Sequence, residues 1–165
     1  MMLAPPPIRV RVFLSWCHRD VALKTDLVER LEPNLAILGG IDFSWWEDSQ
    51  LEIGEAWRRG ILDRLSECDY ALLLLSPGFF ASRFVTTEEL PRIIGAKASA
   101  RALPVMLRTV PLDGSRTMHG VENAQVFTDA GKSYADLAGA LRDRYASNLA
   151  TAIQGRVQGR GWRRL

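Results

Sequence analysis

The chain has 165 residues, enough for one domain with a buried core, and 47% of them are hydrophobic and 24% charged. This composition is that of an ordinary globular protein and excludes a disordered or fibrous chain. The formal net charge of +2 is too small to indicate a polyanionic partner. The first residues lack the basic start and apolar core of a signal peptide, and no apolar run approaches the roughly 18 residues needed to span a bilayer. We therefore expect a cytoplasmic protein with no membrane partner.

The two cysteines, Cys17 and Cys68, lie far apart and form no C-x-x-C pair. They predict neither a metal site nor a disulfide, which fits a reducing compartment. Residues 155–165 form a basic tail with four arginines and no acid: Arg156, Arg160, Arg163 and Arg164. Such a tail can contact nucleic acid, but we expect a frayed terminus or the start of a linker, and no nucleic-acid partner.

Strands and amphipathic helices alternate along the first half of the chain. Apolar runs at residues 9–15, 41–46 and 70–75 predict strands. Residues 20–35 and 54–67 predict helices, because apolar residues recur there at every fourth position. The third strand ends in four consecutive leucines, a pattern typical of a central parallel strand that is buried on both faces.

The second half continues this alternation. Residues 86–98 predict a helix, which Pro91 confines to a late or irregular start. Residues 102–107 and 125–127 predict short fourth and fifth strands. Ser133-x-x-Asp136 predicts a capping box that begins the last helix.

These elements predict an α/β fold: a flavodoxin-like five-stranded parallel sheet in the order 2-1-3-4-5, with helices on both faces. We divide the chain into an N-terminal arm at residues 1–8, one domain at 9–154 and the basic tail at 155–165. The segment at 109–123 is the long loop of this arrangement.

In this strand order a ligand crevice opens between the first and third strands, at their carboxyl ends. A phosphoacceptor receiver domain would need acids at these strand ends, where the chain has Ser15-Trp16 and Ser76-Pro77. Neither G-x-G-x-x-G nor G-x-x-x-x-G-K-[ST] occurs, so the usual phosphate-binding loops are absent from the sequence. What remains is an aromatic-lined crevice with one acid, Glu89, and no cluster of metal ligands.

Three groups of residues resemble a bacterial Toll/interleukin-1 receptor (TIR) domain, in that family's order and approximate spacing. They are Phe13-Leu14-Ser15-Trp16 followed by Asp20; Trp46-x-Asp48 followed by Gly54 and Trp57; and Ser76-Pro77 followed by Phe79, Ser82, Phe84, Glu89 and Leu90. The chain departs from the family pattern at Trp16-Cys17, at Ile53, where a proline is common, and at Phe84, where tryptophan is common.

The resemblance implies an NAD+ nucleosidase that cleaves the nicotinamide–ribose bond, with NAD+ as substrate, no cofactor and no metal; some members then cyclise the ADP-ribose. It also implies one catalytic glutamate after the third strand, for which Glu88 and Glu89 compete. Glu89 matches the family motif, because a leucine follows it and apolar residues stand four and five positions later. The substrate-binding residues that we expect are Ser15, Trp16, Trp46, Asp48 and Phe84.

Family members also self-associate through the loop that follows Trp46. Here that loop carries the apolar residues Leu51 and Ile53, so we expect Leu51, Ile53 and Gly54 to form the self-association surface. The resemblance further implies homotypic TIR–TIR assembly in bacterial immune signalling, with a sensor domain or a downstream effector as partner. The alternative function is a non-catalytic scaffold that acts through the same assembly.

Several site residues also have a purely structural interpretation. Glu89 fits a capping-box partner of Thr86, and Asp48 fits an Asx-type turn within its loop. Ser15 and Ser76 fit hydroxyls that bond loop backbone instead of a substrate. The position of each side chain distinguishes these interpretations.

Overall fold

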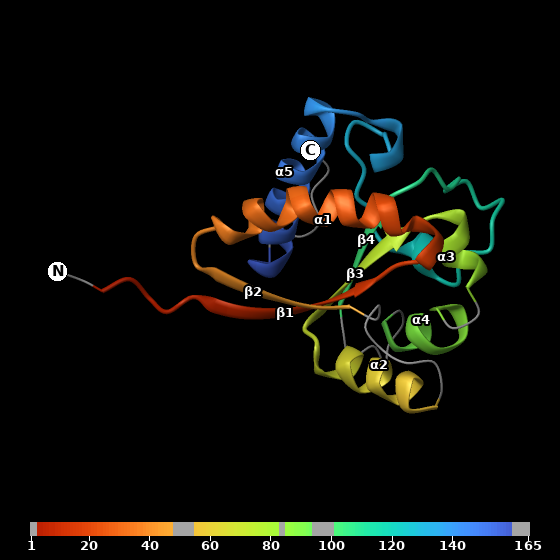
Figure 1. Ribbon diagram of the computed structural model, residues 1–165, viewed down its shortest axis with the longest axis horizontal. Helices are drawn as coiled ribbons and strands as arrows, with labels where there is room; N and C mark the ends of the chain where they lie inside the picture. Colours follow the sequence, from red (N-terminus) through yellow and green to blue (C-terminus); the bar gives the residue numbers. More distant parts are fainter. Residues whose placement is uncertain (1–2, 48–54, 83–84, 94–100, 160–165) are drawn as a thin grey trace.

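The computed structural model describes residues 3–47, 55–82, 85–93 and 101–159; for residues 55–58, 88 and 101 it describes the backbone alone. Its strands and helices alternate along the chain, as the sequence predicts (Figure 1). Among the described residues, no helix is both long and apolar enough to cross a membrane.

Four parallel strands form one sheet in the order β2-β1-β3-β4. This order confirms the predicted α/β class and the first four positions of the expected topology. β3 is buried at all six positions, because strands flank it on both sides and helices cover both faces. The strands span Ile8–Ser15 (β1), Ile41–Glu47 (β2), Tyr70–Leu75 (β3) and Arg101–Met106 (β4), all within one residue of the predicted bounds.

The expected fifth strand is reduced to a single bridge between Val105 and Phe127. The Met106 amide donates to the Phe127 carbonyl at 2.9 Å, and the Phe127 amide donates to the Pro104 carbonyl at 2.8 Å. A longer ladder would next require a donor from residue 104 on this same side. Proline has no N–H, so the pairing ends after one bridge.

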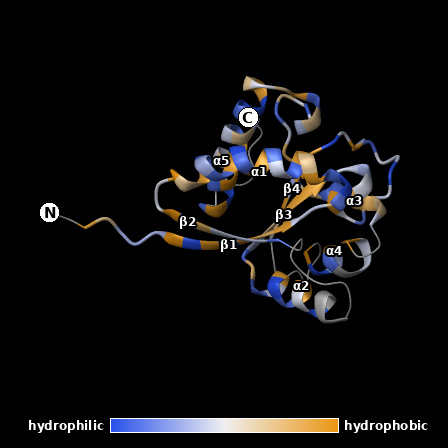
Figure 2. Ribbon diagram, in the orientation of Figure 1, coloured by the Kyte–Doolittle hydropathy of each residue, from blue (hydrophilic) through white to orange (hydrophobic). Residues whose placement is uncertain are grey.

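The helices form a layer on each face of the sheet. In Figure 1, α1 and α5 lie above the strands, and α2 and α4 lie below them. The hydrophobic residues gather on the strands between these layers (Figure 2) and divide into two core clusters, one for each face. The long helices span Val21–Ala36 (α1), Glu55–Glu67 (α2) and Ala140–Val157 (α5).

The last helix begins later than the sequence predicts. Ser133 and Asp136 do form the expected capping box, but it begins only the short 3-10 turn η5, Tyr134–Asp136. The chain then becomes extended at Leu137, and α5 starts at Ala140, after Gly139 in a positive-φ conformation. A capping box stabilises a first turn and does not specify how far the helix continues.

The segment after β3, for which the sequence predicts no helix, forms the short helix α3, Pro77–Ala81. The Ser76 hydroxyl accepts a hydrogen bond from the Phe79 amide at 3.0 Å, and Pro77 occupies the first turn. These are an N-cap residue and the residue favoured next to it. Beyond α3 follow a π-helical turn, η3 (Val85–Glu89), and a short helix, α4 (Leu90–Ile93).

Candidate active site

Glu89 is fully buried, at 0% exposure, at the end of the π-helical turn η3. Its neighbours Val85 and Leu90 belong to the core cluster on the α2 side of the sheet. Pro91 lies two residues after Glu89 and cannot donate the amide hydrogen that a regular helix needs, which fits the irregular helix start that the sequence predicts. Such π-helical turns are often found at functional sites.

The Glu89 carboxylate lies against the carboxyl end of β1. Its Oε2 accepts a hydrogen bond of 2.5 Å from the hydroxyl of Ser15, the last residue of that strand. Ser15 is itself fully buried, so this bond joins two segments 74 residues apart inside the core. The structure therefore brings together two of the residues that the sequence singles out.

The capping-box interpretation of Glu89 does not match this geometry. Thr86 lies within η3, and its amide donates to the Ser82 carbonyl at 3.1 Å. Its hydroxyl donates to the same carbonyl at 3.0 Å. In a capping box the Thr86 amide would donate to the Glu89 carboxylate. Here the amide and the hydroxyl both donate to the Ser82 carbonyl.

Trp46 lies on the same face of the sheet as Glu89. Its ring stacks on Phe13 with centroids 5.2 Å apart and planes 23° apart, and the Arg64 guanidinium lies 5.9 Å from the ring centroid. Trp46 is partly buried and lines a cavity of about 270 Å³ with Trp45, Arg64 and Cys68. Trp46 is therefore an aromatic side chain on the face that holds Glu89, and its cavity is lined by neither Glu89 nor Ser15.

Trp16 occupies the opposite face, because successive residues at the end of a strand point to opposite sides. It is buried in the cluster beneath α1 and α5, with the Lys24 ammonium 4.4 Å above its ring and the His18 ring 5.1 Å away. Its indole Nε1 is buried and has no acceptor among the described residues. The structure therefore separates Trp16 from the Ser15–Glu89 pair.

Several predicted site residues lie outside the described residues. These are Asp48 and Phe84 among the expected substrate-binding residues, and Leu51, Ile53 and Gly54 on the expected self-association surface.

A polar cluster that the sequence did not indicate joins three strand ends. Asp20 is buried at 4% exposure and receives a short hydrogen bond from the Ser76 hydroxyl. Its other oxygen accepts from Arg108 Nε at 2.8 Å. Asp20 follows β1, Ser76 directly follows β3 and Arg108 lies two residues past β4, so only the folded sheet brings them together.

The geometry of this end of the sheet can be set beside known proteins. The sequence profile of the TIR domain matches residues 12–151, which run from within β1 into α5. The chain belongs to the TIR domain family. The family assignment confirms the resemblance drawn from the motifs.

A relative of this TIR domain is the uncharacterized protein y4lF of Sinorhizobium fredii (strain NBRC 101917 / NGR234). The two are 29% identical over 146 residues, which cover 78% of this chain and 43% of the relative. The chain thus spans less than half the length of that relative.

The TIR domain has a second cavity, of about 420 Å³, near the carboxyl end of β4. Apolar and hydroxyl side chains line it, among them Met106, Thr109, Val110, Leu112 and Ser133. No group of three or more potential metal ligands occurs in the part of the chain that the structure describes. Among the described residues, the carboxyl ends of these strands therefore offer the buried Glu89 carboxylate with its Ser15 donor and the Asp20–Arg108 ion pair.

Proposed function

We propose that this TIR domain is an NAD+ nucleosidase that cleaves the nicotinamide–ribose bond, with Glu89 as its catalytic carboxylate. The observation that carries the proposal is the Ser15–Glu89 hydrogen bond at the carboxyl end of β1. Open α/β sheets bind ligands at this edge, next to the strand where the connection order reverses. In this chain β1 and β3 are the two strands that flank that point.

The reaction needs little acid catalysis. The C1′–N bond breaks, the bonding pair leaves with nicotinamide, which becomes neutral, and positive charge develops on the ribose C1′ and ring oxygen. A carboxylate in a dry site stabilises that charge, as in glycoside hydrolysis. Water then adds to C1′ and loses a proton to give ADP-ribose; if a nitrogen of the same molecule's adenine adds instead, the product is cyclic.

Ser15 has a positioning role in this proposal. Its hydroxyl holds one carboxylate oxygen of Glu89, which limits rotation of the side chain. The partly buried Trp46 supplies an aromatic surface on the same face, and a positively charged pyridinium ring binds such a surface with about 0.5–2 kcal/mol.

Glu89 is 0% exposed, so substrate access requires this end of the sheet to open. We propose that self-association through Leu51, Ile53 and Gly54 produces the open form. In a bacterial cytoplasm, assembly would then convert a signal into NAD+ consumption, with a sensor domain or an effector as a further partner.

The test is chromatography of NAD+ incubated with concentrated protein. Glu89→Gln and Glu89→Ala should each lower turnover by about 10²–10⁴-fold, the effect of losing one positioned catalytic group. Glu29→Gln, which changes an exposed glutamate on α1, is the matched control and should leave turnover unchanged. Turnover that persists in folded Glu89 variants would contradict the assignment.

A second candidate is a non-catalytic TIR scaffold. The complete burial of Glu89 favours it, because a buried carboxylate bound to Ser15 also fits a group that only fixes η3 against β1. Light scattering on Leu51→Asp and Ile53→Asp tests the assembly surface, with Ile37→Asp, at an exposed apolar residue after α1, as control. If the protein is a scaffold, the Glu89→Gln variant should assemble as the parent does. Neither protein should then release nicotinamide under any condition of assembly.

A further inference from the structure

The Asp20–Ser76–Arg108 cluster lies at the sheet edge where the proposed substrate would enter. Its three residues follow β1, β3 and β4, and the first two of these strands flank the reversal point of the sheet. The Ser15–Glu89 pair stands at the end of the same β1. A ligand bound at Glu89 therefore shares this edge with Arg108.

Arg108 is fixed at two points. Its backbone amide donates to the Leu75 carbonyl at 3.0 Å, which ties the residue to the end of β3. Its Nε donates to Asp20 at 2.8 Å, and the Ser76 hydroxyl holds the other oxygen of that carboxylate. The contact with Asp20 uses Nε and the side chain is 47% exposed, so the terminal amino groups of the guanidinium are left for a ligand.

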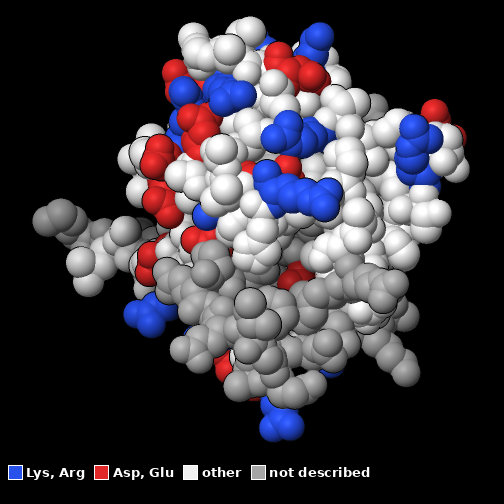
Figure 3. Space-filling view, turned by 45° about the vertical axis from the view of Figure 1, so that its right-hand side comes forward, with Lys and Arg blue, Asp and Glu red and all other residues white. Residues whose placement is uncertain are grey.

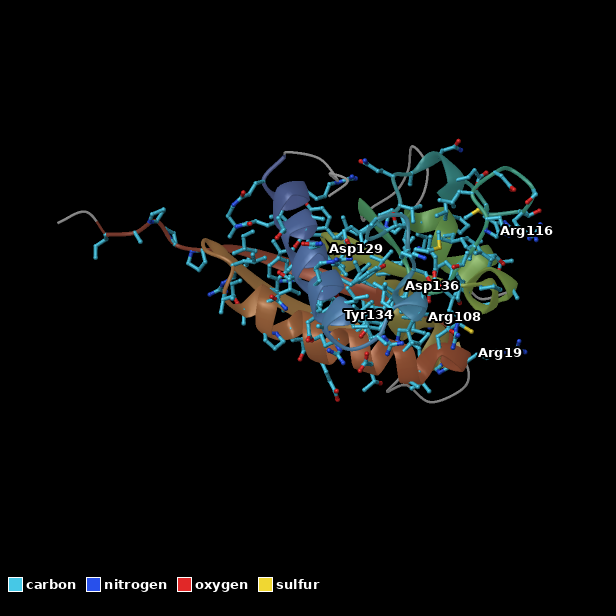
Figure 4. All side chains as sticks on the ribbon, turned by 90° about the horizontal axis from the view of Figure 1, so that it is seen from above. Arg19, Arg108, Arg116, Asp129, Tyr134 and Asp136 are labelled. Carbon is cyan, nitrogen blue, oxygen red and sulfur yellow. The ribbon has the colours of Figure 1, made fainter. Side chains whose placement is uncertain are left out.

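A second arginine lies near this edge. Arg19 is exposed and lies next to Asp20 in sequence, and its Cδ lies 3.8 Å from the position of a Cβ on Gly78, at the start of α3. Figure 4 shows Arg19 and Arg108 at the same end of the molecule, and Figure 3 shows several basic side chains on the face turned forward. Two arginines, Arg19 and Arg108, thus lie at the end of the molecule that holds Asp20.

We propose that Arg108 binds the diphosphate of the dinucleotide substrate, with Asp20 and Ser76 as the residues that position its guanidinium. The inference rests on the proposed function. A guanidinium held along one edge presents its remaining N–H groups in a fixed fork, which matches phosphate oxygens. The cost of ordering this side chain is met in the free protein, so binding loses less entropy.

A second arginine–aspartate pair in the chain resembles the pair of Arg108 and Asp20. Arg144 on α5 is 50% exposed and its Nε donates at 2.9 Å to Asp129, which is 6% exposed. The exposures and the pairing atom match those of Arg108 and Asp20. Asp129 lies beside α5 and away from Arg19 in Figure 4. The Arg144–Asp129 pair is therefore a control: an ion pair of the same kind that lies away from the proposed ligand site.

The first measurement is calorimetric binding of ADP-ribose to the parent chain, Arg108→Gln, Arg108→Lys and Arg144→Gln. We expect about 10–100-fold weaker binding in Arg108→Gln, the scale for lost charged hydrogen bonds, and a smaller loss in Arg108→Lys, which keeps the charge near Asp20. Arg144→Gln should bind as the parent does, although it loses an equivalent ion pair. Equal affinity in the parent and both folded Arg108 variants would overturn the inference, and so would an equal loss in Arg144→Gln.

The second measurement compares turnover of NAD+ with that of nicotinamide riboside, which lacks the diphosphate. Arg108→Gln should raise KM for NAD+ by about 10–100-fold, leave kcat within a few-fold and leave nicotinamide riboside unaffected. A matching loss for nicotinamide riboside would show that Arg108 acts on the site in general and would contradict a diphosphate contact.

The two proposals fail separately. If the parent binds ADP-ribose through Arg108 but releases no nicotinamide from NAD+, the nucleosidase activity is wrong and the anion site stands. If it cleaves NAD+ with a KM that Arg108→Gln does not change, the activity stands and the Arg108 assignment is wrong. A parent that neither binds ADP-ribose nor cleaves NAD+ overturns both.

Discussion

At the scale of single residues, the geometry of Glu89 depends on the Ser15 hydroxyl. Both groups are fully buried and share a 2.5 Å hydrogen bond. Ser15→Ala should lower the free energy of unfolding by about 1–3 kcal/mol, because it leaves a buried carboxylate without this donor. Urea denaturation measures the change.

Ser66→Ala is the control for Ser15→Ala. The Ser66 hydroxyl is exposed and bonds only the Asp63 carbonyl in its own helix, so its loss should change stability by less than about 0.5 kcal/mol. If the two alanine variants unfolded at the same urea concentration, the buried bond would contribute nothing beyond an ordinary surface hydroxyl.

The two cysteines should differ in reactivity. Burial, together with the nearby Asp69 and Glu67 carboxylates, raises the pKa of the Cys68 thiol to about 11. The thiolate is the reactive form, so iodoacetamide at pH 8 should label the partly exposed Cys17 first and Cys68 only after denaturation. Peptide mass spectrometry follows both sites, and equal labelling of the folded protein would contradict the burial argument.

At this scale the sequence predicts which residues belong to the site better than it predicts where their side chains point. The motif selected Glu89 and Ser15, and the structure brings them into contact. The same motif grouped Trp16 with them, yet adjacent residues at a strand end point to opposite faces, and Trp16 lies in the other core cluster. Arg108 could not be found at all, because its partner Asp20 is 88 residues away in the sequence.

At the scale of elements, the turn between Asp129 and Lys132 carries backbone strain. Its two central residues, Ala130 and Gly131, have φ values of 52° and 77°, and the flanking residues exchange hydrogen bonds at 3.2 and 2.9 Å. This is the backbone pattern of a type I′ turn, in which the first central position favours asparagine or glycine.

Ala130→Asn should therefore stabilise the domain by about 0.5–1 kcal/mol, because a left-handed conformation costs alanine roughly 1 kcal/mol. Ala130 is exposed, so the substitution removes no core contact. Thermal unfolding tests the prediction, with Ala130→Val expected to shift the midpoint downwards. A lower midpoint for Ala130→Asn would show that this turn does not limit stability.

The elements show where periodicity is sufficient and where it is not. Four strands and the helices α1 and α2 follow from apolar spacing, because one repeating pattern extends over each of them. Two helices did not follow from spacing: the short helix α3 was not predicted, and α5 begins at Ala140 although the capping box is at Ser133. Local signals mark possible starts, while tertiary packing decides how far a helix extends.

At the scale of the whole molecule, an ion cluster joins α1 to the segment before α5 and to α5 itself. Asp26 on α1 accepts hydrogen bonds from the Tyr134 hydroxyl and from Arg142, and pairs with Arg30. Partial burial alone would raise the pKa of the Asp26 carboxyl, but these hydrogen bonds and the two arginine charges hold it below the ordinary value of 3.8.

A carboxyl group with a lowered pKa contributes stability above its unfolded pKa and loses it as the pH falls. The free energy of unfolding should therefore decrease below about pH 4, and Asp26→Asn should decrease less over the same range. Urea titrations at successive pH values measure both curves. Parallel curves for the parent and the variant would mean that Asp26 is not the group that protonates.

Pro104 sets a limit on how the sheet can grow. Pro104 lies beside the one-residue bridge between Val105 and Phe127 and has no amide hydrogen to donate. A strand of another molecule that displaced the Phe127 segment would therefore have a carbonyl without a donor at this point. Fibril growth by addition of strands at the β4 edge is therefore disfavoured. We therefore expect an ordered polymer of the domain to use surfaces other than the β4 edge.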